Sequence, residues 1–127
     1  MSIHDSSDLN SIKNTVQSYF HGMGQAEAEA LESAFHPESK LLYVEDGKMQ
    51  QLASTTWFES VRARKAAGTS RPFTSASIET IDITQDSASV KTQVEYPTHT
   101  FTDYLSLLKI GQEWKIVHKI FHYHPKV

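Results

Sequence analysis

The sequence contains no cysteine, and this absence excludes several kinds of site at once. Without thiols there is no disulfide framework, no thiolate metal ligand and no cysteine nucleophile. The 127 residues must therefore be held together by a hydrophobic core. At this length about two-thirds of the unfolded chain's surface can be buried on folding, so we expect one domain over residues 1–127.

The chain also has no excess of positive charge. The 12 Lys and Arg residues against 15 Asp and Glu give a net charge of -3, so no basic field favours nucleic acid or an anionic membrane. No apolar run is long enough to cross a bilayer, and residues 1–8 are polar and acidic, unlike a secretory signal. Glycine-rich phosphate-binding loops are missing as well. We therefore expect a cytoplasmic protein that binds neither nucleic acid nor membrane.

Apolar residues at three- and four-residue spacing predict a first helix that begins near residues 6–8 and is ended by Gly22 and Gly24. Good helix formers over 25–34 predict a second helix, which ends before Pro37 because a residue that precedes proline disfavours the α region. A third helix is predicted from a cap within 54–56 to Gly68. The stripe of the first helix consists of Leu9, Ile12, Val16, Tyr19, Phe20 and Met23.

Strands are predicted around these helices and after them. The pair Asp46-Gly47 is a strong hairpin signal. Helices followed by a run of antiparallel strands are typical of an α+β protein. We predict an α+β protein in which three N-terminal helices pack on one face of a single, mostly antiparallel sheet of about six strands. The predicted strands span residues 40–45, 48–52, 73–83, 87–96, 100–110 and 114–123.

The last predicted strand has two unlike faces, because side chains alternate along a strand. Trp114, Ile116, His118, Ile120 and His122 fall on one face, and Lys115, Val117, Lys119, Phe121 and Tyr123 fall on the other. In the preceding strand Phe101, Asp103, Leu105 and Leu107 form the more apolar set, which places Asp103 inside. The hairpin is then expected to bring Asp103 opposite His122.

Two interpretations of these polar residues stay open. In the first, Asp103 orients His122 or His118 for general acid/base catalysis, such as enolisation of a ketone or elimination of water. In the second, Asp103 and His122 only hydrogen-bond to one another near the rim of the core, and His118 is a hydrogen-bonded core residue.

Ring-bearing side chains give a second set of candidate site residues. Several rings with a few polar groups are typical of small-molecule pockets, but the same rings also build ordinary cores. His36, beside Pro37, either lines the same cavity or caps the preceding helix. The predicted ligand-binding residues are Tyr19, His36, Tyr43, Trp57, Phe58 and Tyr96.

The seven histidines do not predict a metal site. His118 and His122 would lie about 13 Å apart along a strand, which is too far to share one ion. His122 and His124 are closer, but no third ligand is evident. We predict neither a metal nor a cofactor.

Four segments together resemble the nuclear transport factor 2-like superfamily, and within it the family called putative lumazine-binding. They are residues 34–37 (AFHP), 46–47 (DG), 101–110 (FTDYLSLLKI) and 114–121 (WKIVHKIF). The resemblance implies a cystatin-like α+β cone, in which a curved sheet wraps around the helices, a pocket in the open end of the cone, and homodimers formed through the sheet. The superfamily includes ketosteroid isomerases, scytalone dehydratase, polyketide cyclases and non-catalytic modules, so the fold alone does not decide function.

Three functions therefore remain open: a small-molecule-binding protein whose pocket suits an aromatic or heterocyclic ligand, an isomerase or dehydratase that uses an Asp/His pair, and a dimeric protein-interaction module. A homodimer is also expected because the convex face of the sheet would otherwise expose apolar surface. The residues predicted on that face are Tyr104, Leu108, Ile110, Val117, Phe121 and Tyr123.

Overall fold

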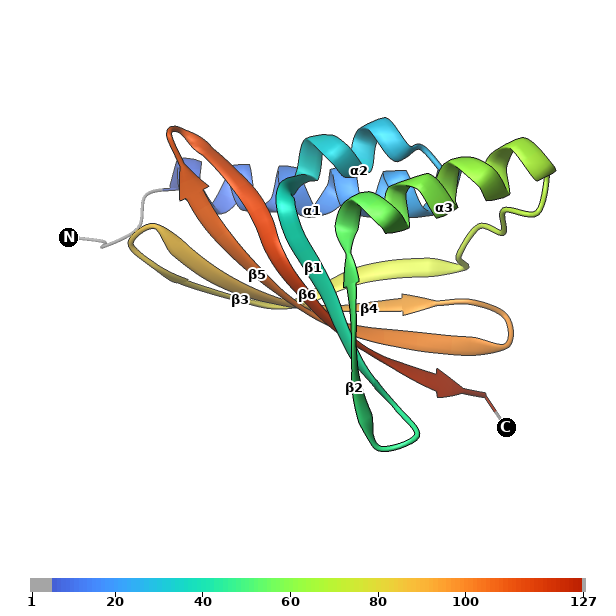
Figure 1. The fold of residues 1–127 in the computed structure, drawn as a ribbon. Coiled ribbons are helices and arrows are strands. Elements are labelled where there is room, and N and C mark those ends of the chain that lie inside the picture. Colours follow the sequence, from blue (N-terminus) through green and yellow to red (C-terminus); the bar gives the residue numbers. More distant parts are fainter. Residues whose placement is uncertain (1–5, 127) are drawn as a thin grey trace.

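The structure, a computed structural model, describes residues 6–126. It contains three helices on one face of a sheet (Figure 1). The helices are α1 (Ser6–Gln25), α2 (Ala28–Ala34) and α3 (Ser54–Ala67). The strands are β1 (Phe35–Glu45), β2 (Lys48–Ala53), β3 (Ser75–Thr84), β4 (Ser87–Glu95), β5 (His99–Ile110) and β6 (Glu113–Pro125).

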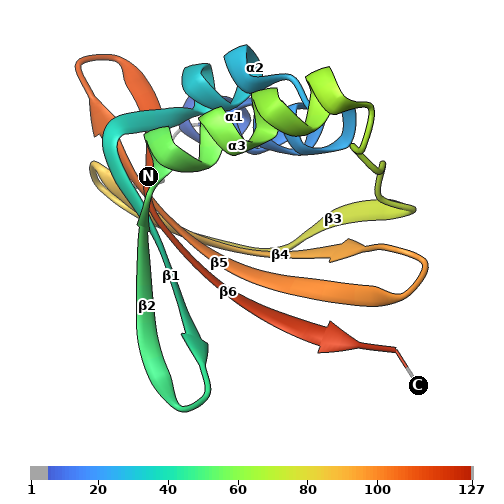
Figure 2. The same cartoon turned by 45° about the vertical axis from the view of Figure 1, so that its right-hand side comes forward.

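The six strands form one sheet in the order β2-β1-β6-β5-β4-β3. Neighbouring strands are antiparallel except β1 and β6, which are parallel. The predicted α+β class and six-stranded sheet are confirmed. Figure 2 shows that the tip of the β1–β2 hairpin and the end of β6 project away from the helical layer. No helix within residues 6–126 is long and apolar enough to cross a membrane.

The two glycines near the end of α1 do not end it, contrary to the prediction. The helix continues through Gly22 and Gly24 to Gln25, and the chain turns at Ala26, whose φ is 52°. A Cβ atom on Gly22 would lie 2.6 Å from Leu31 Cδ2, so this glycine permits close packing of α1 against α2. Gly68, with φ of 71°, ends α3 as predicted.

The core lies between the helices and the inner face of the sheet. Its most deeply buried side chains come from both layers and include Ile12, Val16, Leu31, Val90, Leu105 and Ile116. On β4 and β5 the buried residues alternate with exposed ones, which is the expected pattern for strands with one face against helices.

The alternation on β6 is interrupted by a β-bulge at Val117. Ile116 pairs with Leu107 and His118 pairs with Ser106, so Val117 has no partner on β5. An extra residue in one strand shifts the side-chain alternation by one position. All side chains of β6 beyond the bulge therefore lie on the opposite face from that predicted by continuous alternation.

Candidate functional site

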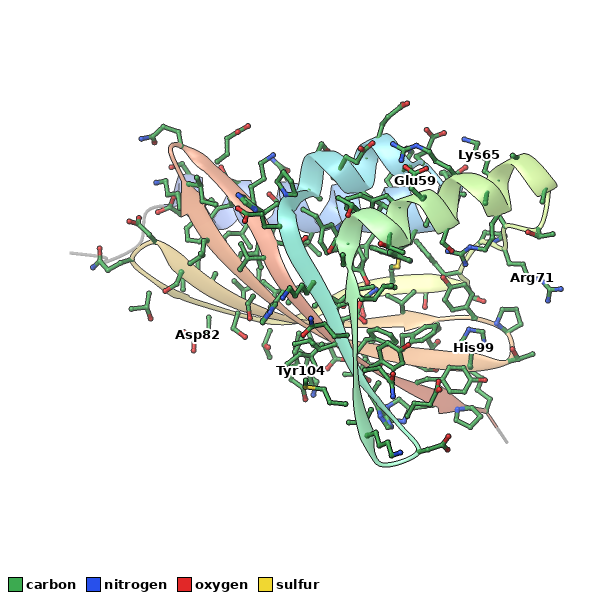
Figure 3. The ribbon with its side chains drawn as sticks, viewed as in Figure 1. Glu59, Lys65, Arg71, Asp82, His99 and Tyr104 are labelled. Atoms are coloured by element: carbon green, nitrogen blue, oxygen red, sulfur yellow. The ribbon has the colours of Figure 1, made fainter. Side chains whose placement is uncertain are left out.

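A cavity of about 420 Å³ opens between the helical layer and the inner face of the sheet. The exposed residues of its lining, Arg64, Thr69, Ser70 and Arg71, mark its open end, which we call the mouth. Arg71 and His99 lie at the same end of the molecule (Figure 3). The rest of the lining comes from α1, α3, the inner face of the sheet and the connections at Ala26 and Tyr96: Tyr19, Met23, Ala26, Leu41, Tyr43, Leu52, Trp57, Val61, Val94, Tyr96, His99, Phe101, Asp103, Lys119 and Phe121.

Asp103 is the acidic residue of this cavity, and its side chain is almost completely buried. It lies on the inner face of β5 and is 1% exposed. The hydroxyl groups of Tyr19 and Thr92 both donate to Asp103 Oδ2, at 2.5 and 3.0 Å. Asp103 Oδ1 is buried and accepts no hydrogen bond from residues 6–126. One carboxylate oxygen is thus held in place while the other is free to accept a donor.

Lys119 contributes a buried cation to the same cavity. The residue is 7% exposed, and its Nζ lies over three ring faces, 4.4 Å from the centroid of Trp57, 4.9 Å from Tyr19 and 5.2 Å from Phe121. Within residues 6–126 this amine makes no hydrogen bond or ion pair. Burial lowers the pKa of Lys119, and the carboxylate of Asp103 opposes that shift.

The predicted Asp103–His122 pair is not formed. Asp103 pairs with Phe121, while His122 pairs with Thr102 on the outer face of the sheet and is exposed. His118 is exposed on the outer face as well. The prediction failed because it continued the alternation of Trp114 and Ile116 through Val117.

The same bulge reverses other predicted positions on β6. Lys119, Phe121 and Tyr123 fall on the inner face, not on the outer face as predicted, and Ile120 falls on the outer face. Lys119 and Phe121 were therefore missed as cavity residues. A signal was present, because the apolar residues Ile116 and Phe121 are five positions apart, and continuous alternation would place them on opposite faces of the sheet.

Four of the six predicted ligand-binding residues line the cavity: Tyr19, Tyr43, Trp57 and Tyr96. Phe58 does not, since it is buried in the core with its ring centroid 5.8 Å from that of Phe35. His36 neither lines the cavity nor caps α2. Its Nδ1 accepts a hydrogen bond from the backbone N–H of Glu38, at 3.1 Å.

The outer face of β6 carries a pair of histidines. The ring centroids of His122 and His124 are 4.3 Å apart, and the Nε2 of His124 lies 3.3 Å from Thr102 Oγ1. Among residues 6–126, no three His, Cys, Asp or Glu side chains are grouped so that they could hold a metal ion.

Comparisons with known proteins agree with this architecture. The model of a family described as "Putative lumazine-binding" matches residues 7–122. A protein named aldolase FrzH, from Cladobotryum sp., is 28% identical over an alignment of 123 residues, and the match covers 95% of this chain and 95% of that one.

Solved structures with the same fold include two nuclear transport factor 2-like proteins of unknown function. The one from Shewanella baltica OS155 has a TM-score of 0.83 and 24% identity, and the match covers 98% of this chain and 100% of that one. The one from Methylobacillus flagellatus KT has a TM-score of 0.78 and 23% identity, with 98% of each chain covered. At these identities the likeness concerns the fold.

Proposed function

The chain belongs to the putative lumazine-binding family of nuclear transport factor 2-like proteins, and we propose that its cavity binds a small, ring-bearing organic molecule. The volume of about 420 Å³ is within the range of roughly 300–1,000 Å³ that is usual for ligand sites. Flat rings form much of the wall, and rings stack well on aromatic or heterocyclic ligands. The ring-bearing lining residues are Tyr19, Tyr43, Trp57, Tyr96, Phe101 and Phe121.

The observation that carries this proposal is the unpartnered Oδ1 of Asp103. Buried polar atoms are nearly always hydrogen-bonded, because an unsatisfied one loses its hydration without compensation. A ligand N–H or O–H that reaches Oδ1 would supply the missing donor. Lys119, on the inner face of the neighbouring strand β6, would donate to an acceptor of the same ligand. Heterocycles with a ring N–H beside a carbonyl carry both groups on one edge.

The binding proposal is tested by calorimetry with lumazine and with lumazines methylated on their ring nitrogens. We expect the unmethylated compound to bind wild-type protein, and Asp103→Asn to bind it at least about tenfold more weakly. Asp82→Asn is the matched control, because Asp82 is exposed on β3 (Figure 3). A screen of flavins, pterins and steroid-like compounds in which none binds, or in which both variants bind alike, would contradict the proposal.

A second candidate function, acid/base catalysis on a carbonyl compound, is favoured by the similarity to a protein named as an aldolase. In this reaction Asp103 Oδ1 would remove a proton from the carbon beside the carbonyl. The ammonium of Lys119 would stabilise the enolate oxygen. The enolate carbon would then bond to a second carbonyl carbon, and the resulting alkoxide would take up the proton. The exposed histidines His118 and His122 have no part in this scheme.

The catalytic candidate is tested by NMR in deuterated water, by following exchange of the α-hydrogens of small aldehydes and ketones. Asp103→Asn should reduce any protein-dependent exchange by about 10²-fold or more. His122→Ala should leave the exchange rate unchanged because this side chain lies on the outer face. If the histidine variant lost the exchange and the Asp103 variant retained it, the scheme would be wrong.

A further inference from the structure

The cavity has a charge opposite in sign to that of the whole chain. The sequence carries a net charge of -3. Among the described residues that line the cavity, Arg64, Arg71 and Lys119 are basic and Asp103 is the acidic one. Asp103 is nearly inaccessible to solvent, whereas both arginines are exposed at the mouth. A ligand that approaches the mouth therefore meets positive charge first.

The cations of α3 differ in the partners that they have. Arg62 is hydrogen-bonded to Glu59 and Glu32, and Lys65 Nζ lies 2.8 Å from Glu27 Oε1. These are charge pairs on the protein surface.

Arg64, by contrast, forms no ion pair within residues 6–126 and lines the cavity. Basic side chains near the end of a helix also offset the helix dipole. That explanation applies equally to Lys65, which is paired with a glutamate outside the cavity. The position of Arg64 at the mouth thus needs a reason besides the helix dipole.

The charge of Arg64 affects the pKa values of two residues that line the cavity, Lys119 and Tyr96. Burial is the largest cause of the lowered pKa of Lys119. The carboxylate of Asp103 opposes this shift, and the positive charge of Arg64 adds to it. Burial raises the pKa of Tyr96, and Arg64 opposes that shift. Two cations that face one cavity repel each other. An anion bound between them would be attracted to both, and these two attractions would offset the repulsion.

We propose that the ligand carries an anionic group, a carboxylate, sulfonate or phosphate, and that this group binds between Arg64 and Lys119. The ring edge lies deeper, where Asp103 Oδ1 accepts from the ring N–H and a second N–H of the Lys119 ammonium donates to the ring carbonyl. The inference rests on the proposed binding function and narrows its ligand class. A guanidinium matches the geometry of such oxyanions because it presents parallel N–H donors. Arg71, at the mouth, adds to the field that attracts the anion.

Two fluorescent probes that differ by a single sulfonate test this inference. They are 8-anilinonaphthalene-1-sulfonate and the neutral N-phenyl-1-naphthylamine, both of which gain fluorescence in apolar sites. We expect wild-type protein to bind the sulfonate about tenfold more tightly than the neutral probe. Arg64→Gln should abolish this preference and leave binding of the neutral probe within about twofold. Arg62→Gln, on the same helix, should change neither affinity.

Three results would overturn the inference. Equal affinity of the two probes, or equal effects of Arg64→Gln and Arg62→Gln on the sulfonate, would show that the mouth does not select anions. In these two cases, binding of the neutral probe would leave the proposed cavity function intact. If neither probe bound, the anion site and its ring-binding cavity would both be refuted.

Discussion

Tyr19 and Asp103 are 84 positions apart in the chain, yet the Tyr19 hydroxyl donates a 2.5 Å hydrogen bond to Asp103 Oδ2. Burial and the adjacent carboxylate raise the pKa of Tyr19 well above its usual value, so the hydroxyl keeps its proton and acts as a donor. The bond joins α1 to β5 and orients the carboxylate so that Oδ1 remains available. The bond therefore holds the helix against the sheet and also fixes the position of the Asp103 carboxylate.

Tyr19→Phe removes this donor and leaves Thr92 as the remaining partner of Asp103 Oδ2. We expect the free energy of unfolding to fall by about 1–3 kcal/mol, because a buried carboxylate loses a hydrogen bond that water does not replace. Urea unfolding monitored by circular dichroism measures the change. Tyr43→Phe is the matched control, since the Tyr43 hydroxyl makes no hydrogen bond within residues 6–126, and should change stability by less than about 0.5 kcal/mol. Equal effects of the two substitutions would contradict the expectation.

Lys119→Met should raise the free energy of unfolding at pH 7 by about 1 kcal/mol, because it removes a buried cation while keeping an apolar stem. The folded-state pKa of Lys119 lies below its unfolded value, so the ammonium costs stability below the folded pKa. That cost disappears as the pH rises past the unfolded value, near roughly 10.4. The charged or titratable groups that face the amine are Asp103, Arg64 and Tyr19.

The measurement is urea unfolding of both proteins between pH 7 and pH 10.5. The stability difference should shrink with rising pH, and the ionisation of Tyr19 largely cancels because both proteins contain it. Lys48→Met, at an exposed position on β2, should show no such trend. A Lys119→Met protein less stable than wild type at every pH would show that the ring contacts outweigh the burial.

The outer face of the sheet exposes a set of apolar side chains that would be covered in a homodimer. Ile120, which is 48% exposed, lies on this face between the exposed His118 and His122. We expect a particle of about twice 14.3 kDa by light scattering, and a monomer for Ile120→Asp. Members of this outer-face set are Val44, Met49, Tyr104, Leu108, Ile110 and Ile120.

Ala63→Asp adds the same charge to an exposed position on α3 and should leave the wild-type mass unchanged. A wild-type monomer at micromolar concentration would refute the dimer. The outer face would then be free for a different protein, which is the third function considered above.

Gly22→Ala should destabilise the protein by about 1–3 kcal/mol, because the new Cβ would lie 2.6 Å from Leu31 Cδ2 and 2.7 Å from Leu31 Cγ. In a Leu31→Ala background, which itself costs about 2–5 kcal/mol, this contact is absent and the substitution should cost much less. Thermal or urea unfolding of the wild type, the two single variants and the double variant measures the coupling energy between the two substitutions. An unchanged penalty in the Leu31→Ala background would place the cause elsewhere.

The sequence by itself determined the local elements of this protein. The Asp46-Gly47 turn and the Gly68 helix end are both present, because each depends on backbone preferences of a few adjacent residues. Alternation along β5 also placed Asp103 on the buried face. These features can be read from short windows because strands and helices have fixed side-chain periods.

Only the tertiary structure decided which residues of β6 share the cavity with Asp103. The bulge at Val117 depends on how β6 pairs with β5, and pairing is a property of two strands that a window on one strand does not contain. That one extra residue turns His122 outward and Lys119 inward. The contact between Tyr19 and Asp103 likewise exists only once a helix and a distant strand have packed together.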